Sequence, residues 1–200
     1  MFKKKLFFLI LITCNLVKSQ TELKINLASG ILLVPNIGIE IQINERLGYQ
    51  LDTSASFWDS VDGSPFQFTQ IFNELRYYPK QKKEKNERTF FVGPHIGYGM
   101  FTLRNPRILT SVIDSQTKPK GSYQSGRNTY YGLSFGKKIK LNNPKFGLEI
   151  FLGGGSSQSN YKYYNSNEEL EYDDPVAKRN FSKSGEELVY RGGIMLVYKL

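Results

Sequence analysis

Six ionisable residues are the side chains of this sequence best placed to do chemistry, and each lies within a run of alternating apolar residues. They are three glutamates, two arginines and the only histidine, namely Glu40, Glu74, Arg76, His95, Glu149 and Arg191. Successive side chains of a β-strand point to opposite faces, so the alternation puts all six on one face, among glycines. Carboxylates and guanidinium groups on a buried face must pair, because an unpaired buried charge is costly. We therefore expect a network of ion pairs inside the protein, with a proton or ion path as the alternative role.

No catalytic, cofactor or metal site is expected. Any histidine-based triad must use His95, whose place in the alternation directs it inward, where the acyl chains of a membrane could not reach it. The three glycines at 153–155 are not followed by the lysine and hydroxyl pair of a phosphate-binding loop. The acidic segment consists of Glu168, Glu169, Glu171, Asp173 and Asp174. It lacks the spacing of a known calcium loop, so a solvated loop is expected, with calcium binding as the alternative.

Two segments show the alternation most clearly. Residues 37–43 have isoleucine at every odd position, opposite glycine, glutamate and glutamine. Residues 146–153 carry Phe, Leu, Ile and Leu on one face, opposite Gly, Glu, Phe and Gly. In an exported chain this pattern predicts an outer-membrane β-barrel, with lipid outside and a polar interior.

Turn signals divide the chain into eight predicted strands. They cover residues 22–31, 37–44, 48–58, 67–78, 89–103, 128–140, 146–155 and 187–200. The two longest connections, 104–127 and 156–186, then lie at the outer end, and the short turns at 44–47 and 141–145 lie at the other. Pro94 falls inside the fifth strand, where we expect a bulge or a strand end.

Residues 1–20 are predicted to be a signal peptide, and residues 21–200 the barrel domain. Three lysines precede an apolar stretch from Leu6 to Ile12 that is too short to span a bilayer. We expect cleavage after Ser19 or Gln20, with lipidation of Cys14 as the alternative. Cys14 is the only cysteine, so the exported chain has neither disulfides nor thiol chemistry.

Charge and hydropathy argue against a nucleic-acid-binding protein and against a helical membrane protein. The formal net charge is +9, and loss of the four leader lysines leaves +5. This charge would attract lipopolysaccharide or phospholipid head groups, or simply keep the loops soluble. No basic run is interleaved with aromatic residues, so nucleic-acid binding is not expected. The mean hydropathy is −0.40, and the chain after the leader has no apolar run long enough for a membrane-spanning helix.

The chain resembles a Bacteroidota family of small outer-membrane barrels known as a domain of unknown function. The matching residues are Glu40 in the isoleucine-rich strand, Glu-Leu-Arg-Tyr-Tyr at 74–78, Phe-Val-Gly-Pro-His-Ile-Gly-Tyr-Gly at 91–99, the glycines at 132 and 136, Leu148-Glu149 with the glycines at 153–155, and Leu196-Val197-Tyr198. The resemblance implies an outer-membrane barrel and supplies no activity or substrate. The C-terminal residue is Leu200, not the aromatic residue that the barrel-assembly machinery commonly reads.

We therefore predict an all-β protein, an eight-stranded antiparallel up-and-down transmembrane β-barrel. It is expected to be a monomer in the outer membrane, with lipid, lipopolysaccharide and the barrel-assembly machinery as partners and a structural or surface-interaction role. One alternative is a secreted lipocalin-like ligand-binding barrel, which would have an apolar cavity and a polar exterior. The other is a lipid-modifying barrel enzyme, which would need His95 near a serine at the rim.

Overall fold

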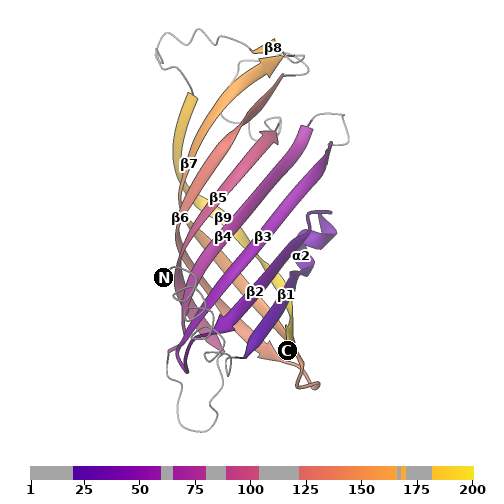
Figure 1. Ribbon diagram of the computed structural model, residues 1–200, viewed down its shortest axis with the longest axis vertical. Helices are drawn as coiled ribbons and strands as arrows, with labels where there is room; N and C mark the ends of the chain where they lie inside the picture. The colour runs from indigo at the N-terminus through magenta and orange to yellow at the C-terminus, as the bar shows by residue number, and fades with distance from the viewer. Residues whose placement is uncertain (1–19, 60–64, 80–88, 104–121, 166–167, 170–181) are drawn as a thin grey trace, which may run out of the picture.

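The computed structural model describes residues 20–59, 65–79, 89–103, 122–165, 168–169 and 182–200. Its elements are β1 (Thr21–Asn26), α2 (Leu27–Ile31), β2 (Asn36–Gln42), β3 (Leu47–Asp59), β4 (Pro65–Tyr77), β5 (Phe90–Leu103), β6 (Ser122–Lys140), β7 (Phe146–Asn165), β8 (Glu168–Glu169) and β9 (Ser182–Lys199). Helix α2 is a single short turn, and strands make up nearly all of the rest (Figure 1).

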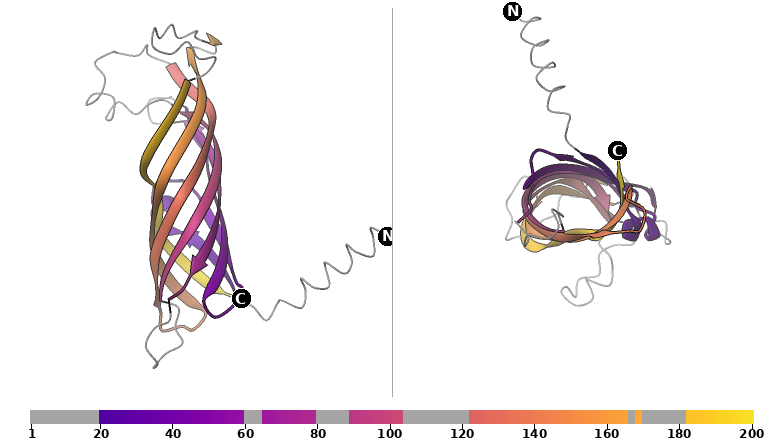
Figure 2. Two further views of the ribbon diagram at one scale, coloured as in Figure 1. Left: turned by 90° about the vertical axis from the view of Figure 1, so that its left-hand side faces the viewer. Right: turned by 90° about the horizontal axis from the view of Figure 1, so that it is seen from below.

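The strands form one antiparallel sheet that closes on itself. Neighbours follow the order β6-β5-β4-β3-β2-β1-β9-β7, and a further pairing between β6 and β7 completes the ring. The two-residue β8 only extends the end of β7. Seen along its axis, the ribbon encloses a lumen (Figure 2). The predicted eight-stranded antiparallel β-barrel is confirmed.

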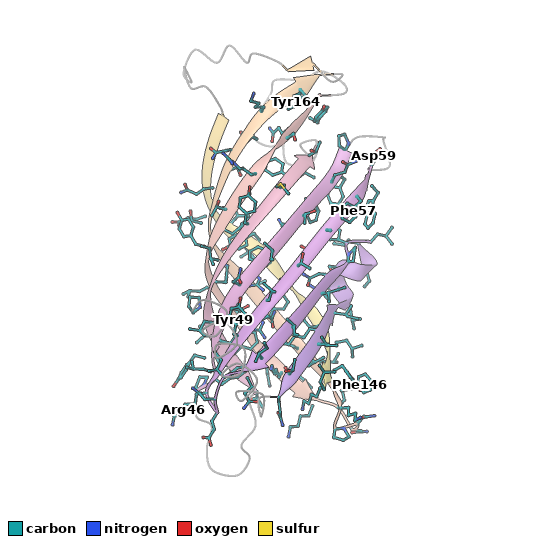
Figure 3. The ribbon with its side chains drawn as sticks, in the orientation of Figure 1. Arg46, Tyr49, Phe57, Asp59, Phe146 and Tyr164 are labelled. Atoms are coloured by element: carbon teal, nitrogen blue, oxygen red, sulfur yellow. The ribbon has the colours of Figure 1, made fainter. Side chains whose placement is uncertain are left out.

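The alternation along each strand separates apolar from polar side chains. Ile96, Leu133 and Ile150 each expose half or more of their surface on the outside of the barrel. Their neighbours in sequence, such as His95, Ser134 and Glu149, are buried in the lumen. The side chains that project from the ribbon in Figure 3 are therefore largely the apolar half of each strand. The barrel is inverted relative to a soluble protein.

Three strands are longer than predicted, and the first is shorter. Strands β6 and β7 stay paired up to Ser122 and Asn165, and β9 already begins at Ser182, so the predicted loops 104–127 and 156–186 are partly strand. Polar residues on both faces hid this extension, because apolar periodicity is the main signal for a strand. The predicted strand 22–31 ends at Asn26, whose side chain accepts a hydrogen bond from the backbone N–H of Ser29 and begins α2.

The register of β5 is not interrupted at Pro94, contrary to the expected bulge or strand end. Pro94 pairs with Leu133 within a continuous β5–β6 ladder. The register shift lies instead between β7 and β9, where Gly153 faces Arg191 and Gly154 faces Val189. Tyr190 is the extra residue on β9. A bulge of this kind redirects side chains next to it.

The two short turns lie at the same end of the barrel, as predicted. The turn between β2 and β3, the turn between β6 and β7 and the ends of β1 and β9 share one end, where Leu200 N–H donates to the carbonyl of Thr21 (Figure 1). We call this the terminal end, and the other the loop end. The β1–β2 pair is short, so α2 sits about halfway up the wall. In the described part of the chain, no helix is long and apolar enough to cross a membrane.

Candidate functional site

A cluster of charged side chains fills the lumen nearest the terminal end. Lys24 on β1 is fully buried, and its Nζ lies 2.6 Å from Glu149 Oε2 on β7 and 2.5 Å from Glu40 Oε2 on β2. Arg76 on β4 is also fully buried, and its Nη1 lies 2.8 Å from Glu149 Oε1 and 2.9 Å from Glu40 Oε2. Two cations and two carboxylates from four strands thus form a closed square of ion pairs. Charges buried to this degree are tolerated only because each is paired.

Lys138 covers this square on the side of the terminal end. Its Nζ lies 2.6 Å from Glu22 Oε2 and 3.0 Å from Glu40 Oε2. The hydroxyl of Tyr78 donates to the other oxygen of Glu40, Oε1. Glu40 therefore accepts from Lys24, Arg76, Lys138 and Tyr78, which leaves neither of its oxygens without a partner.

A second group of ion pairs lies further toward the loop end. Arg191 Nη2 lies 2.5 Å from Asp52 Oδ2, and its Nη1 lies 3.0 Å from Glu74 Oε2. Two links join the two groups. In the first link, Arg76 Nε lies 3.2 Å from Glu74 Oε1. In the second, the side-chain amide nitrogen of Gln50 donates to Asp52 Oδ2 at 3.1 Å, and the side-chain oxygen of Gln50 accepts from Lys24. We call the whole set the charge network.

His95 joins the charge network only through a hydroxyl. Its Nδ1 lies 2.8 Å from Ser134 Oγ, which also accepts from Arg191 Nη1 at 3.3 Å. Its Nε2 lies 2.6 Å from the hydroxyl of Tyr190. The ring of Phe72 contacts it edge-on, with the centroids 5.9 Å apart. His95 and Ser134 are thus neighbours, but both are buried in the lumen and neither lies at a rim.

All six residues singled out from the sequence lie in the lumen, and five of them form ion pairs with one another or with further residues. The members that sequence reasoning missed are Glu22, Lys24, Asp52 and Lys138, with Gln50, Tyr78, Ser134 and Tyr190 as hydrogen-bond partners. Lys24 carried a usable signal, since it lies between Leu23 and Ile25 of a strand, whereas Asp52 is followed by the polar residue Thr53. Within the described residues the charge network holds five carboxylates and four cations, which nearly balance.

Small and apolar residues complete the filling of the lumen. A Cβ on Gly153 would lie 2.7 Å from both Arg191 Cγ and Ser134 Oγ, so the network needs glycine there. Near the terminal end, the charges border a buried apolar cluster of Tyr78, Phe91, Phe151, Met195 and Val197. The guanidinium carbon of Arg76 lies 3.9 Å from the centroid of the Phe91 ring. An eight-stranded barrel is just wide enough for side chains to fill it, as here.

The bulge in β9 explains how two consecutive residues enter the lumen. Tyr190 reaches His95, and the next residue, Arg191, reaches Asp52 and Glu74. In a regular strand one of the two would face outward. Met195 and Val197 follow Arg191 by regular alternation and are also buried in the lumen.

The arrangement can support a compact barrel and close its lumen to solvent. No group of three or more histidine, cysteine, aspartate or glutamate side chains in the described ranges could hold a metal ion. Only Glu168 and Glu169 of the acidic segment 168–174 lie within these ranges, so the calcium alternative falls mostly outside the described residues, as does the leader 1–19.

Comparison with known proteins gives one match. A family model described as "Protein of unknown function (DUF3575)" matches residues 5–199, nearly the whole chain. No curated protein and no solved structure matches.

Proposed function

The chain belongs to the family described as protein of unknown function DUF3575, and we propose that it is an outer-membrane β-barrel with a structural or surface-interaction role. The observation that carries the proposal is the inverted distribution of side chains. Isoleucine, leucine and phenylalanine side chains ring the outside, while lysine, arginine and glutamate side chains pair inside. Water on the outside would make this arrangement very unfavourable, whereas hydrocarbon on the outside makes it stable.

The height of the apolar band suits a bilayer. On β5 the outward residues Val92, Pro94, Ile96, Tyr98 and Met100 are all exposed. Eight residue steps at about 3.4 Å give about 27 Å along the strand, or about 21 Å along the membrane normal at a tilt of about 40°. This value is close to the apolar band of about 25 Å in known outer-membrane barrels.

Polar and basic side chains flank the band on both sides. At the terminal end Arg46, Lys140 and Lys145 are exposed and could bind anionic phospholipid head groups. Toward the loop end the outer face of β6 and β7 changes to residues such as Thr129 and Gln158. This polar extension of the two strands is the described surface that we propose contacts lipopolysaccharide or another partner outside the cell.

The charge network is proposed to be a structural plug. Its members form ion pairs across the lumen. Aromatic rings cover the network on the side of the loop end, where the ring centroid of Phe72 lies 4.7 Å from the guanidinium carbon of Arg191. A path for ions would need exchangeable water along these groups, whereas Lys24, Arg76 and Glu149 have no exposed surface.

Neither alternative class has comparable support. A lipocalin-like barrel needs an apolar interior and a polar exterior, which is the opposite of this arrangement. A lipid-modifying enzyme needs a nucleophile that an acyl ester can reach. Ser134 lies beside His95 but has no exposed surface.

Fractionation of cells and cysteine labelling test the proposal together. The expected result is recovery of the protein in the detergent-extracted outer membrane, with a gel mobility that changes on heating. Because Cys14 is the only cysteine, two single-cysteine variants can report orientation. A membrane-impermeant maleimide should label Lys162→Cys, near the loop end of β7, on intact cells, and should label Asn143→Cys, at the terminal end, only after lysis. Recovery in the periplasm or the medium would overturn the proposal.

A further inference from the structure

In the part of the chain that the structure describes, the barrel wall is incomplete toward the loop end. Pairing between β2 and β3 ends at Asn36 and Ser54, and pairing between β1 and β9 ends at Asn26 and Met195. Beyond these pairs β3 continues to Asp59, and β9 extends back to Ser182. Within the described ranges, no strand joins these two edges. We call this opening the lateral window; it is bordered by residues 55–59, residues 182–194 and α2.

The missing part of the wall corresponds to two strands. At the level where β1 and β2 are present, three inter-strand spacings of about 4.8 Å separate β3 from β9. Where these two strands are missing, the same separation leaves an opening of roughly 14 Å. Helix α2 forms its lower border and packs beside β9 (Figure 1). The side-chain amide of Asn26 donates to the carbonyl of Gly192 at 3.2 Å, which caps the edge of β9 where β1 stops.

Apolar side chains surround the lateral window. On the side of α2, Ile31, Leu32 and Leu33 expose 83%, 72% and 70% of their surface. Phe57 on β3, labelled near the loop end in Figure 3, exposes 71%, and Val189 on β9 exposes 60%. The border of the window is therefore continuous with the apolar outer surface of the barrel. Hydrocarbon that covers this surface would also cover the window.

The lumen at the level of the window is aromatic rather than charged. Its floor is a group of three rings, with Tyr130 at 4.8 Å from Tyr190 and 5.2 Å from Phe72 between centroids. Above this floor, Phe66 contacts Phe68 edge-on, and Phe101 contacts Tyr161. A hollow of about 790 Å³ is lined by aromatic residues that include Phe57, Phe68, Phe101 and Tyr161, and by polar and basic residues that include Gln67, Thr102, Ser125, Arg127, Asn160 and Lys162. We call this space the aromatic trough.

Two pairs of polar groups near the aromatic trough are hydrogen-bonded to each other, whereas Asn160, which lines the trough, has a buried Oδ1 without a hydrogen-bond partner. The amide of Gln70 donates to the hydroxyl of Tyr130 at 2.7 Å, and Asn128 donates to Ser157 at 2.9 Å. A ligand in the trough therefore meets ring faces, hydrogen-bonded polar groups and one amide oxygen that has no partner. A volume of this size is typical of a site for a small apolar ligand.

We infer that the aromatic trough binds one acyl chain of a membrane lipid, which enters sideways through the lateral window. The inference rests on the proposed membrane location, because only a lipid bilayer would place acyl chains against the apolar border formed by α2 and Phe57. The head group of this lipid stays at the outer border of the window, while its chain lies against the rings of Phe68, Phe101 and Tyr161, which line the hollow. The charge network below the floor stops the chain from passing through the barrel.

Trp58 provides a reporter for the bound chain. It is the only tryptophan of the sequence, lies at the edge of the window on β3, and pairs with Phe66. Phosphatidylcholine with brominated acyl chains quenches tryptophan that it touches. In vesicles of this lipid we expect strong quenching of Trp58, and we expect Phe68→Asp to reduce it by about half or more, since a charge in the trough disfavours hydrocarbon. Thr129→Asp, on the outer face of β6, is the matched control and should leave quenching unchanged.

A second variant and a second measurement keep the test decisive. Phe101→Asp places the charge on a neighbouring strand, and wild-type protein extracted from membranes should retain one lipid in native mass spectrometry. The inference is overturned if the folded, membrane-inserted variants quench like wild type, or if the wild-type protein carries no lipid. Failure of the protein to insert into vesicles at all would instead refute the proposed membrane location.

Discussion

Replacement of Glu149 by glutamine tests whether the charge network stabilises the barrel. The change keeps the shape of the side chain but removes the negative charge that faces Lys24 at 2.6 Å and Arg76 at 2.8 Å. All three side chains are fully buried, so water cannot replace the lost partner. Removal of one member of a buried ion pair typically costs about 3–5 kcal/mol. Lys24 and Arg76 both keep Glu40, which places the expected loss in the free energy of unfolding near the lower limit, at about 3 kcal/mol.

The assay is urea unfolding of the protein in lipid vesicles, followed by Trp58 fluorescence and by the heat-dependent change in gel mobility. Glu187→Gln is the matched control, because Glu187 is exposed and the same change should shift stability by less than about 0.5 kcal/mol. The double variant Glu149→Gln with Lys24→Met removes one charge of each sign. We expect it to be more stable than the sum of the two single changes predicts, by about 1–3 kcal/mol. Equal midpoints for Glu149→Gln and Glu187→Gln would refute the reasoning, and so would strict additivity in the double variant.

Three further changes test other parts of the structure. Arg191→Leu leaves Asp52 without its cation and Glu74 with Arg76 alone, so we expect a lower unfolding temperature in the gel assay and no conductance in planar bilayers. A stable open channel would contradict a structural plug. Ile96→Arg puts a cation in the middle of the apolar outer band and should lower the free energy of unfolding in vesicles by about 2–4 kcal/mol. Thr129→Arg, beyond this band, should lower it by about 1 kcal/mol or less. Equal losses would argue against lipid on this face. Gly132→Ala places a Cβ at 2.0 Å from the carbonyl oxygen of Gly154, so the yield of folded barrel should fall sharply, and a normal yield would show that β6 and β7 can separate there.

The alternation of side chains was readable because it depends only on local backbone geometry. A strand sends residues such as Ile39 and Glu40 to opposite faces wherever it lies, so the sheet, its two faces and the buried position of Glu40 all followed from the sequence. The helical turn α2 was missed because it begins with two local hydrogen bonds from Ser29 to Asn26 within an otherwise strand-like pattern. The outer parts of β6 and β7 were missed because their polar residues become strand only through pairing with each other.

The charge network was likewise predicted only in part. Its inner face was predicted, but its members Lys24 and Lys138 were not assigned to it, since nothing local distinguishes a cation that meets a carboxylate from one that meets water. Lys24 and Glu149 lie 125 residues apart in sequence and meet only because β9 brings β1 beside β7.

The amino-acid order by itself determined that this chain forms a sheet with one apolar and one charged face, because side-chain direction repeats every two residues. Closure of the sheet decided which cations met which carboxylates and, within the described residues, where the wall is incomplete above α2. Those outcomes depend on strand register and on contacts across the lumen, and no local pattern in the sequence encodes either of them.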